Sequence, residues 1–197
     1  KRPAIKLAIG SYSATLAEGF SRDIQRRIDS DAYRTVFDTR LPTSREQGKR
    51  TAEEFETTAG GSLKAVGRGG PLTGSAVDGG IIDDPLKDRA EAQSPTIRES
   101  LWRWYTDVFK TRLHNDSWQV VIQTRWHEDD LSGRLLESDG VFSETNPTGW
   151  HVVKFPAIRG QEINDYDPRR PGEALWPERH SLARLLDTER KTPATFI

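Results

Sequence analysis

The sequence has neither cysteine nor methionine among its 197 residues. Without cysteine it forms no disulfide, no thiolate metal site and no thiol nucleophile. It also lacks any apolar stretch approaching the roughly 20 residues of a membrane-spanning helix, and no signal-peptide core follows Lys1-Arg2-Pro3. Neither sign of charge is in excess, because 29 Lys and Arg residues stand against 30 Asp and Glu residues. This balance argues against a continuous basic clamp around nucleic acid. We therefore expect a soluble, intracellular protein.

Aromatic residues are well represented in this polar chain. Six Trp and seven Phe distinguish it from disordered segments, although 30% of its residues are charged. A chain of this length buries roughly 70% of the surface that it exposes when unfolded. We expect one domain of moderate size, or one domain with a tail. Because the chain does not begin with Met, we also expect it to be an interior portion of a longer polypeptide.

Short apolar runs alternate with helical patterns along the chain. Thr15 and Glu18 fit a capping box at the start of one helix, and Ser94-Pro95 opens a second helix. Alternation of strands with helices of about ten or more residues predicts an α/β fold of the P-loop NTPase type, with a mainly parallel sheet flanked by helices. Buried strands are expected over Ala4–Ile9, Gly79–Ile82, Trp118–Gln123 and Trp150–Phe155, and a hairpin around 59–61. Beyond Pro156 the chain is rich in Pro, Gly and charge, which predicts a C-terminal extension without its own core.

Two adjacent carboxylates, Asp83 and Asp84, end the apolar strand that includes Ile81 and Ile82. Ligands of open parallel sheets bind beyond the carboxyl ends of the strands. One carboxylate there can hold a hydrated Mg²⁺ while the other orients or deprotonates an attacking water. The alternative is that Asp-Asp-Pro only stops the strand and caps a turn.

A second apolar strand ends in Thr124 and Arg125. A hydroxyl and a guanidinium both suit phosphate oxygens, although Arg125 could equally be an ion-paired surface residue. His127, Asp129 and Asp130 follow, and their spacing suggests a metal cluster. We favour a structural interpretation, in which one of the two aspartates caps the helix that follows.

Arg68 lies in a glycine-rich loop, Gly67–Gly74. This loop has no Lys followed by Ser or Thr, and the phosphate-binding pattern G-x-x-x-x-G-K-[ST] occurs nowhere in the chain. Arg68 is either an ordinary solvated arginine or an arginine finger that reaches the nucleotide of a neighbouring subunit. A second basic set forms either a solvated edge or a surface that faces DNA: Arg98, Arg103, Lys110 and Arg112.

Taken together, these segments resemble the ATPase domain of the large terminase subunit of tailed double-stranded DNA phages. The resemblance runs from IKLAIGSYSATLAEGFSRDIQRRI through GRGGPLTG and GGIIDDPLKDRAEAQ to VVIQTRWHEDDLSGRLLE and GEALWPER, in the family's order. It implies that Asp83 is the Walker B aspartate that positions Mg²⁺. It places Asp84 where the family has the carboxylate that activates water, often Glu, and Thr124 with Arg125 in the motif that couples nucleotide state to DNA movement.

The resemblance also implies the partners and the division of the chain. We expect a motor that couples hydrolysis of ATP, with Mg²⁺, to translocation of double-stranded DNA into the procapsid, working in the host cytoplasm. The expected partners are double-stranded DNA, other copies in a ring, the portal protein and the small terminase subunit, with no membrane. Residues 1–158 would be a partial ATPase domain whose Walker A segment is missing upstream, and 159–197 a linker toward a nuclease domain.

Two other functions remain open. The first is a metal-dependent DNA nuclease that uses Asp83, Asp84 and either His127 or Asp129. It is disfavoured because no third carboxylate ends a comparable strand. The second is a catalytically silent scaffold of the same fold that binds DNA or a partner without nucleotide.

Overall fold

A computed structural model describes residues 4–43, 48–72, 74 and 76–191 of the chain. The strands are β1 (Lys6–Ser11), β2 (Glu54–Glu56), β3 (Ser62–Gly67), β4 (Val77–Asp83) and β5 (Leu113–Ile122). The α-helices are α1 (Ala14–Asp29), α2 (Asp31–Val36), α3 (Arg89–Gln93), α4 (Pro95–Trp104), α5 (Leu131–Asp139) and α6 (Leu182–Lys191). A π-helical turn, Tyr105–Phe109, and a 3-10 turn, Lys110–Arg112, continue α4 toward β5.

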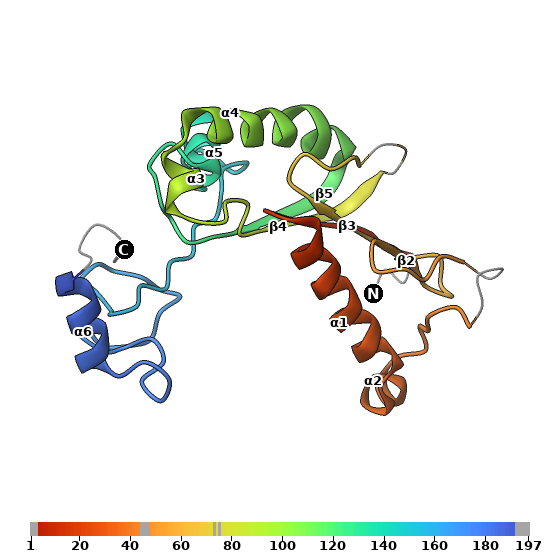
Figure 1. The fold of residues 1–197 in the computed structure, drawn as a ribbon, viewed down its shortest axis with the longest axis horizontal. Coiled ribbons are helices and arrows are strands. Elements are labelled where there is room, and N and C mark those ends of the chain that lie inside the picture. The colour runs from red at the N-terminus through yellow and green to blue at the C-terminus, as the bar shows by residue number, and fades with distance from the viewer. Residues whose placement is uncertain (1–3, 44–47, 73, 75, 192–197) are drawn as a thin grey trace. The chain divides into compact units, whose positions relative to one another are not determined.

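The strands form one mainly parallel sheet in the order β2-β3-β1-β4-β5 (Figure 1). β1 pairs in parallel with both β3 and β4, and β4 pairs in parallel with β5. Only β2 is antiparallel in the described part of the chain, because it forms the predicted hairpin with β3. The prediction of a mainly parallel α/β sheet flanked by helices is therefore confirmed.

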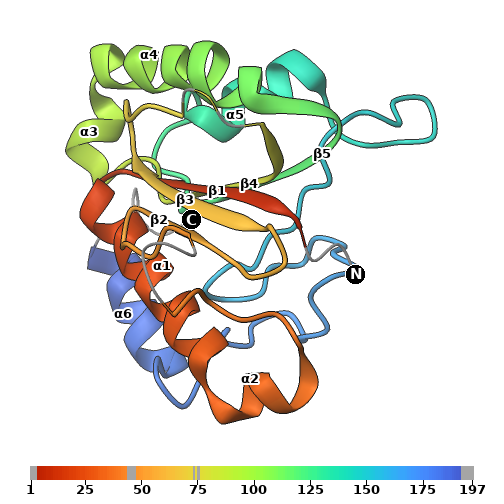
Figure 2. The same cartoon turned by 90° about the vertical axis from the view of Figure 1, so that its right-hand side faces the viewer.

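The sheet lies between α1 on one face and α4 on the other (Figure 2). The apolar positions of α1 recur every three to four residues and point at the sheet, which is the arrangement that buries a helical stripe. The core on this face includes Ile9, Ala17, Ile28, Leu63 and Ala65. On the other face, the Trp104 ring packs over Gly10 and the Phe109 ring over Gly80, since a Cβ at either glycine would lie within 2.8 Å of these rings.

Capping residues set both long helices. Ser94 caps α4 with its hydroxyl and Pro95 occupies the first turn, as predicted. At α1 the N-cap is Ser13, whose hydroxyl accepts from the Leu16 amide, so the predicted start at Thr15 was wrong. Both Ser13 and Thr15 carry a suitable hydroxyl. The earlier one caps the helix because β1 ends at Ser11 and leaves only a short turn.

β5 was predicted to be buried, but one of its faces is exposed. Trp118, Val120 and Ile122 alternate along that face with exposed fractions of 41%, 42% and 53%. β5 is the edge strand of the sheet, and α1 packs over β1 and β3 rather than reaching this far. A continuous apolar run therefore does not imply burial on both faces when the strand lies at an edge.

The chain divides into two compact units, 1–132 and 133–197. The second unit has little regular structure between α5 and α6, and it includes the buried Asp167, which is ion-paired with Arg169 and Arg159. A hydrogen bond from Arg169 holds the pKa of Asp167 below its ordinary value. The predicted boundary after residue 158 falls inside this unit.

The predicted strand Trp150–Phe155 was wrong. Trp150 forms an isolated bridge with Val141, and residues 151–155 are irregular. Val153 and Phe155 are about half exposed, so the apolar pattern has no neighbouring strand to bury it. None of the helices in the described part of the chain combines the length and the apolar character that a membrane-spanning helix requires.

Candidate active site at the carboxyl ends of β1, β4 and β5

The carboxyl ends of three adjacent parallel strands, β1, β4 and β5, lie side by side. Ser11 at the end of β1 is the register partner of Asp83 at the end of β4, and Asp83 is the partner of Ile122 at the end of β5. Side chains of register partners project from the same face of a parallel sheet. The Ser11 hydroxyl and the Asp83 carboxylate are therefore neighbours, at the edge where such sheets bind ligands.

Asp84 has an unusual backbone conformation. Its φ is 41°, and it is the one non-glycine residue with positive φ in the described part of the chain. Asp tolerates the left-handed region better than most residues, yet the conformation persists only where neighbours hold it. Here the Asp84 amide donates to the Ile122 carbonyl at 2.9 Å, and the Asp84 carbonyl accepts from the Tyr12 amide at 3.1 Å. The residue is thus fixed between the ends of β1 and β5.

The pKa of the Asp83 carboxyl is raised above its ordinary value. Partial burial at the strand end is the main cause, and the neighbouring Asp84 charge adds to it. Both causes disfavour the charged form, and a cation would oppose both. A carboxyl group whose pKa is raised by burial and by a neighbouring charge, as that of Asp83 is, is typical of a functional site.

Buried polar atoms without partners among the described residues occur at two of these strand ends. Ser11 is 1% exposed, and its Oγ has no hydrogen-bond partner among the described residues. Both polar atoms of the Gln123 amide, at the end of β5, are likewise buried and unpaired within that part of the chain. Buried hydroxyls and amides are nearly always hydrogen-bonded, so their orphaned state here fits a site that takes up water or a ligand.

These oxygens suit Mg²⁺ better than a transition metal. Mg²⁺ takes one or two carboxylates and keeps several waters, and Asp83, Asp84 and Ser11 offer such a set. No group of three or more His, Cys, Asp or Glu side chains that could hold a metal occurs within the described residues. The Mg²⁺ site at Asp83 stays a prediction, and its carboxylate and hydroxyl oxygens are ligands of the kind that a hydrated Mg²⁺ takes.

Arg68 lies beside these strand ends, and its side chain binds a residue of the same chain. Its backbone amide donates to the Ser11 carbonyl at 2.7 Å. Its guanidinium binds Glu91 of α3 through two hydrogen bonds, Nη1 to Oε2 at 2.7 Å and Nη2 to Oε1 at 3.0 Å. This bidentate pair holds the pKa of Glu91 below its ordinary value.

The segment after β5 brings Thr124 and Arg125 to the same edge of the sheet. Thr124 is exposed, while the Arg125 Nε donates to the buried carboxylate of Asp130 at 2.7 Å. The ion pair with Asp130 therefore stabilises the loop 125–130, and 36% of the Arg125 side chain remains exposed.

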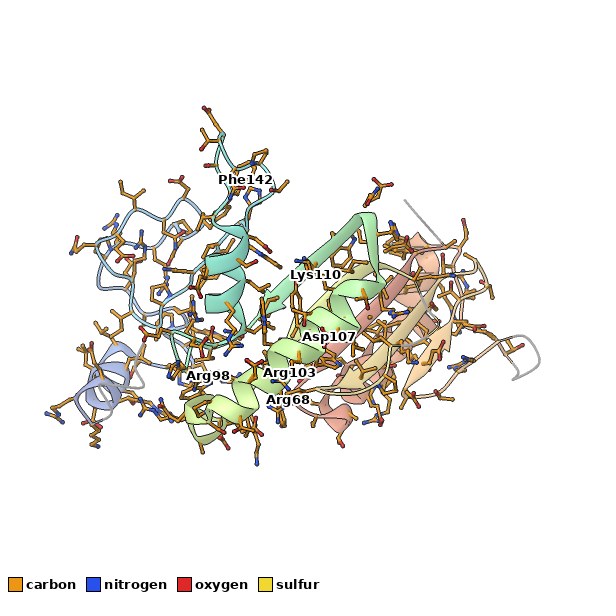
Figure 3. All side chains as sticks on the ribbon, turned by 90° about the horizontal axis from the view of Figure 1, so that it is seen from above. Arg68, Arg98, Arg103, Asp107, Lys110 and Phe142 are labelled. Atoms are coloured by element: carbon orange, nitrogen blue, oxygen red, sulfur yellow. The ribbon has the colours of Figure 1, made fainter. Side chains whose placement is uncertain are left out.

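Asp129 in the same segment binds Arg98 of α4. The Arg98 Nε donates to Asp129 at 2.9 Å, and Nη1 donates to the Ala92 carbonyl at 2.6 Å. His127 accepts the Asp129 amide through Nδ1. Figure 3 looks onto α4 and its continuation, from which Arg98, Arg103, Asp107 and Lys110 project. These contacts support the structural interpretation of His127, Asp129 and Asp130 over a metal cluster.

Sequence reasoning missed Ser11, Gln123 and Glu91. A signal existed for Ser11, because it ends an apolar strand just as Asp83 does. Gln123 carried the same signal beside Thr124. Glu91 carried none, since its partner Arg68 is 23 residues away and only the fold brings the two together.

Comparison with known proteins identifies the family. The family model described as "Terminase large subunit, T4likevirus-type, N-terminal" matches residues 7–192. The chain belongs to this terminase family. The terminase chain also resembles the solved structure of the large terminase ATPase domain of Thermus phage P74-26, with a TM-score of 0.52 and 15% identity, over 100% of this chain and 78% of that one. At that identity the likeness shows the fold. A search of curated proteins found no match.

Proposed function

We propose that this terminase chain is part of the motor that couples ATP hydrolysis to translocation of double-stranded DNA into the procapsid. One observation carries the proposal. Asp83 ends β4 inside a parallel sheet and Asp84 follows it, the buried Ser11 hydroxyl beside Asp83 is unpaired among the described residues, and the pKa of Asp83 is raised. In a terminase large subunit, a carboxylate pair at this edge is suited to an ATP site.

The two carboxylates have different roles in this proposal. Asp83 lies in the strand beside Ser11 and would hold Mg²⁺, which when bound neutralises charge on phosphate oxygens. Asp84 has left the strand at φ 41° and would orient and deprotonate the attacking water. Their separate backbone conformations allow two adjacent carboxylates to point differently.

Thr124 and Arg125 would couple the nucleotide site to DNA movement. Both follow β5 directly, and the Asp84 amide is bonded to the last residue of β5. A displacement at Asp84 therefore acts on the same strand end that carries Thr124. The element that moves in this coupling would be the loop that carries Arg125, whose Nε donates to the Asp130 carboxylate.

Arg68 is proposed to support hydrolysis in a neighbouring subunit of a ring, as an arginine finger. In this structure its guanidinium is bound to Glu91, so a role in trans requires that Arg68 exchange that carboxylate for phosphate oxygens. Mixing Arg68→Ala subunits with subunits that carry Asp84→Asn tests this role. Each variant is expected to be inactive alone, and the mixture should recover part of the activity, because an intact Arg68 then lies next to a subunit with an intact Asp84. A mixture as inactive as either variant alone would contradict a role in trans.

We propose that a Walker A segment completes the sheet at β5. The exposed face of Trp118, Val120 and Ile122 lies on the edge strand, next to the strand end that carries Thr124. A further strand and helix there would cover this apolar surface and bring a phosphate-binding loop to the carboxylate pair. Residues 1–158 would then be part of the ATPase domain, and 159–197 an extension toward a nuclease domain.

The proposed partners follow from the same role. Double-stranded DNA, other copies of the chain in a ring, the portal protein and the small terminase subunit would assemble with it in the host cytoplasm. The balanced charge is suited to a transient grip, since a strongly basic surface would bind DNA phosphates tightly and hinder movement.

The decisive experiment measures ATP hydrolysis by the complete reading frame that encodes this chain. Asp84→Asn keeps the size of the side chain but removes the base, so hydrolysis is expected to fall by about 100-fold or more while Mg²⁺ still binds. Asp107→Asn, the same change at an exposed site in the π-helical turn that continues α4, should leave the rate unchanged. Equal rates for the two variants would contradict the proposal.

A metal-dependent nuclease and a silent scaffold are the alternatives. The nuclease predicts cleavage of plasmid DNA with Mn²⁺ and without ATP, through Asp83 and Asp84. The scaffold predicts DNA or partner binding that is insensitive to ATP and to either substitution. A glycine-rich loop ending in Lys-Ser or Lys-Thr in the upstream reading frame would favour the motor over both.

A further inference from the structure

The Arg68–Glu91 ion pair is partly sheltered from solvent. Its side chains are 19% and 22% exposed, against 70% and 44% for Arg103 and Glu99 on α4. Fork-to-fork contact of this kind is geometrically specific. The pair is therefore suited to hold two segments in a fixed relation.

The segments that it joins are the glycine-rich loop and the chain that leaves Asp84. Glu91 Oε2 also accepts the Lys87 amide at 2.9 Å, and Arg68 Nη1 also reaches the Pro85 carbonyl at 3.3 Å. Pro85 lies one residue after Asp84, and Lys87 lies three residues after it. The Asp88 carboxylate caps α3 by accepting the Glu91 amide at 3.0 Å, so the carboxylates of both Asp88 and Glu91 hold this turn.

Asp84 needs such support on its C-terminal side. Its own backbone groups are held by Ile122 and Tyr12, but a residue at φ 41° relaxes if the following residues are free to move. The Arg68 and Glu91 contacts restrain those residues. Without them, the carboxylate that we assign to water activation would lose its fixed direction.

We propose that Glu91 is a positioning residue of the carboxylate site, which acts through Arg68 and the Lys87 amide to hold Asp84 in its left-handed conformation. This inference rests on the proposed function of Asp83 and Asp84, and it gives Arg68 a first role within its own chain. Glu91 touches neither nucleotide nor metal. A trans role of Arg68 would then be coupled to the site, since release of Glu91 by Arg68 loosens Asp84.

The test compares Glu91→Gln with Glu99→Gln in the full chain. Both substitutions remove one charge from an ion pair with arginine, but only Glu91 is connected to Asp84. Two quantities are measured: the affinity for Mn²⁺ alone, by its paramagnetic effect on the Asp83 and Asp84 amides, and the hydrogen exchange of the Asp84 and Lys87 amides. Glu91→Gln is expected to weaken Mn²⁺ binding by about tenfold and to speed exchange at both amides, and Glu99→Gln to change neither.

A double-mutant cycle with Arg68→Gln tests the route. If Glu91 acts through Arg68, the double variant should bind Mn²⁺ no more weakly than Glu91→Gln alone, because each change breaks the same contact. Additive losses would overturn this route. Unchanged exchange at Asp84 and Lys87 in Glu91→Gln would overturn the positioning role itself.

The two proposals fail in different ways. If Asp83→Asn binds Mn²⁺ as well as the unmodified chain, the assignment of the carboxylate site is wrong. The amide exchange of Asp84 then decides alone whether Glu91 holds its backbone. If Asp83→Asn loses Mn²⁺ binding and Glu91→Gln behaves as Glu99→Gln does in both measurements, only the role of Glu91 is wrong.

Discussion

Ser11 and Asp83 are register partners at the ends of two adjacent parallel strands. The Ser11 hydroxyl is buried and unpaired among the described residues, and the pKa of Asp83 is raised by burial and by Asp84. Each group is therefore less well satisfied in the folded chain than it would be in water. Groups of this kind are expected at a binding site, where they interact with the ligand instead of stabilising the fold.

Asp83→Asn should stabilise the chain at neutral pH. Because the folded pKa of Asp83 lies above the ordinary value of about 3.9, its contribution to stability falls as the pH rises from that value through the folded pKa. The substitution removes this penalty, for a gain of less than about 1 kcal/mol because water screens a half-buried carboxylate. Urea unfolding at pH 7 and at pH 4 measures it, and the gain should shrink at the lower pH.

Ser11→Ala should separate stability from ligand binding. An unpaired hydroxyl contributes no hydrogen bond, so its removal should change the free energy of unfolding by less than about 1 kcal/mol. The affinity for Mn²⁺ should fall by about tenfold if the hydroxyl supports the site. Ser21→Ala removes a buried hydroxyl from α1, away from the carboxylates, and calorimetric titration should find its Mn²⁺ affinity unchanged. Equal Mn²⁺ affinities for the two variants would exclude Ser11 from the site.

Glu91→Gln should show the opposite pH dependence to Asp83→Asn. The hydrogen bonds from Arg68 lower the folded pKa of Glu91, so its contribution is present above the ordinary value of about 4.3 and is lost as the pH falls through the folded pKa. At pH 7 the substitution should cost about 1 kcal/mol, since the pair is only partly buried. Denaturant unfolding near pH 3 should find the variant and the unmodified chain nearly equal. A loss that persists undiminished in acid would contradict the role of the charge.

Gly67→Ala should be among the most harmful small substitutions in the sheet. A Cβ at Gly67 would lie 2.5 Å from the Ala14 nitrogen and 3.1 Å from the Ser13 carbonyl carbon, and backbone at the start of α1 cannot move aside cheaply. We expect a loss of about 1–3 kcal/mol. Gly19→Ala within α1 meets no atom within 4 Å and should instead gain about 0.5–1 kcal/mol. Thermal unfolding of the two variants should therefore shift in opposite directions.

Arg98→Ala should destabilise the chain far more than Arg103→Ala. Arg98 is 8% exposed and binds both Asp129 and the Ala92 carbonyl, so its loss leaves two groups without their donor. The expected cost is about 2–3 kcal/mol. Arg103 pairs with Glu99 in solvent and should contribute less than about 1 kcal/mol. Similar midpoints of urea unfolding for the two variants would contradict this assignment.

Much of the fold follows from local patterns. The helix after Ser94-Pro95, the hairpin around Gly60 and the strand that delivers Asp83 are each set by residues close together in the chain. The errors arose where a neighbouring element decides. Trp118 looked buried because its strand is apolar, but burial depends on what lies next to β5, and Phe155 looked like a strand residue although no partner strand accompanies it.

The amino-acid sequence already indicated a mainly parallel α/β sheet with Asp83 and Asp84 after one apolar strand and Thr124 after another. These features depend on periodicity and on residues adjacent in the chain, which carry their signal locally. Three relationships became visible only in the folded chain: Ser11 lies beside Asp83, Asp84 is held in a left-handed conformation, and Arg68 binds Glu91. Strand order and a contact across 23 residues depend on how the elements pack, and no local pattern encodes that.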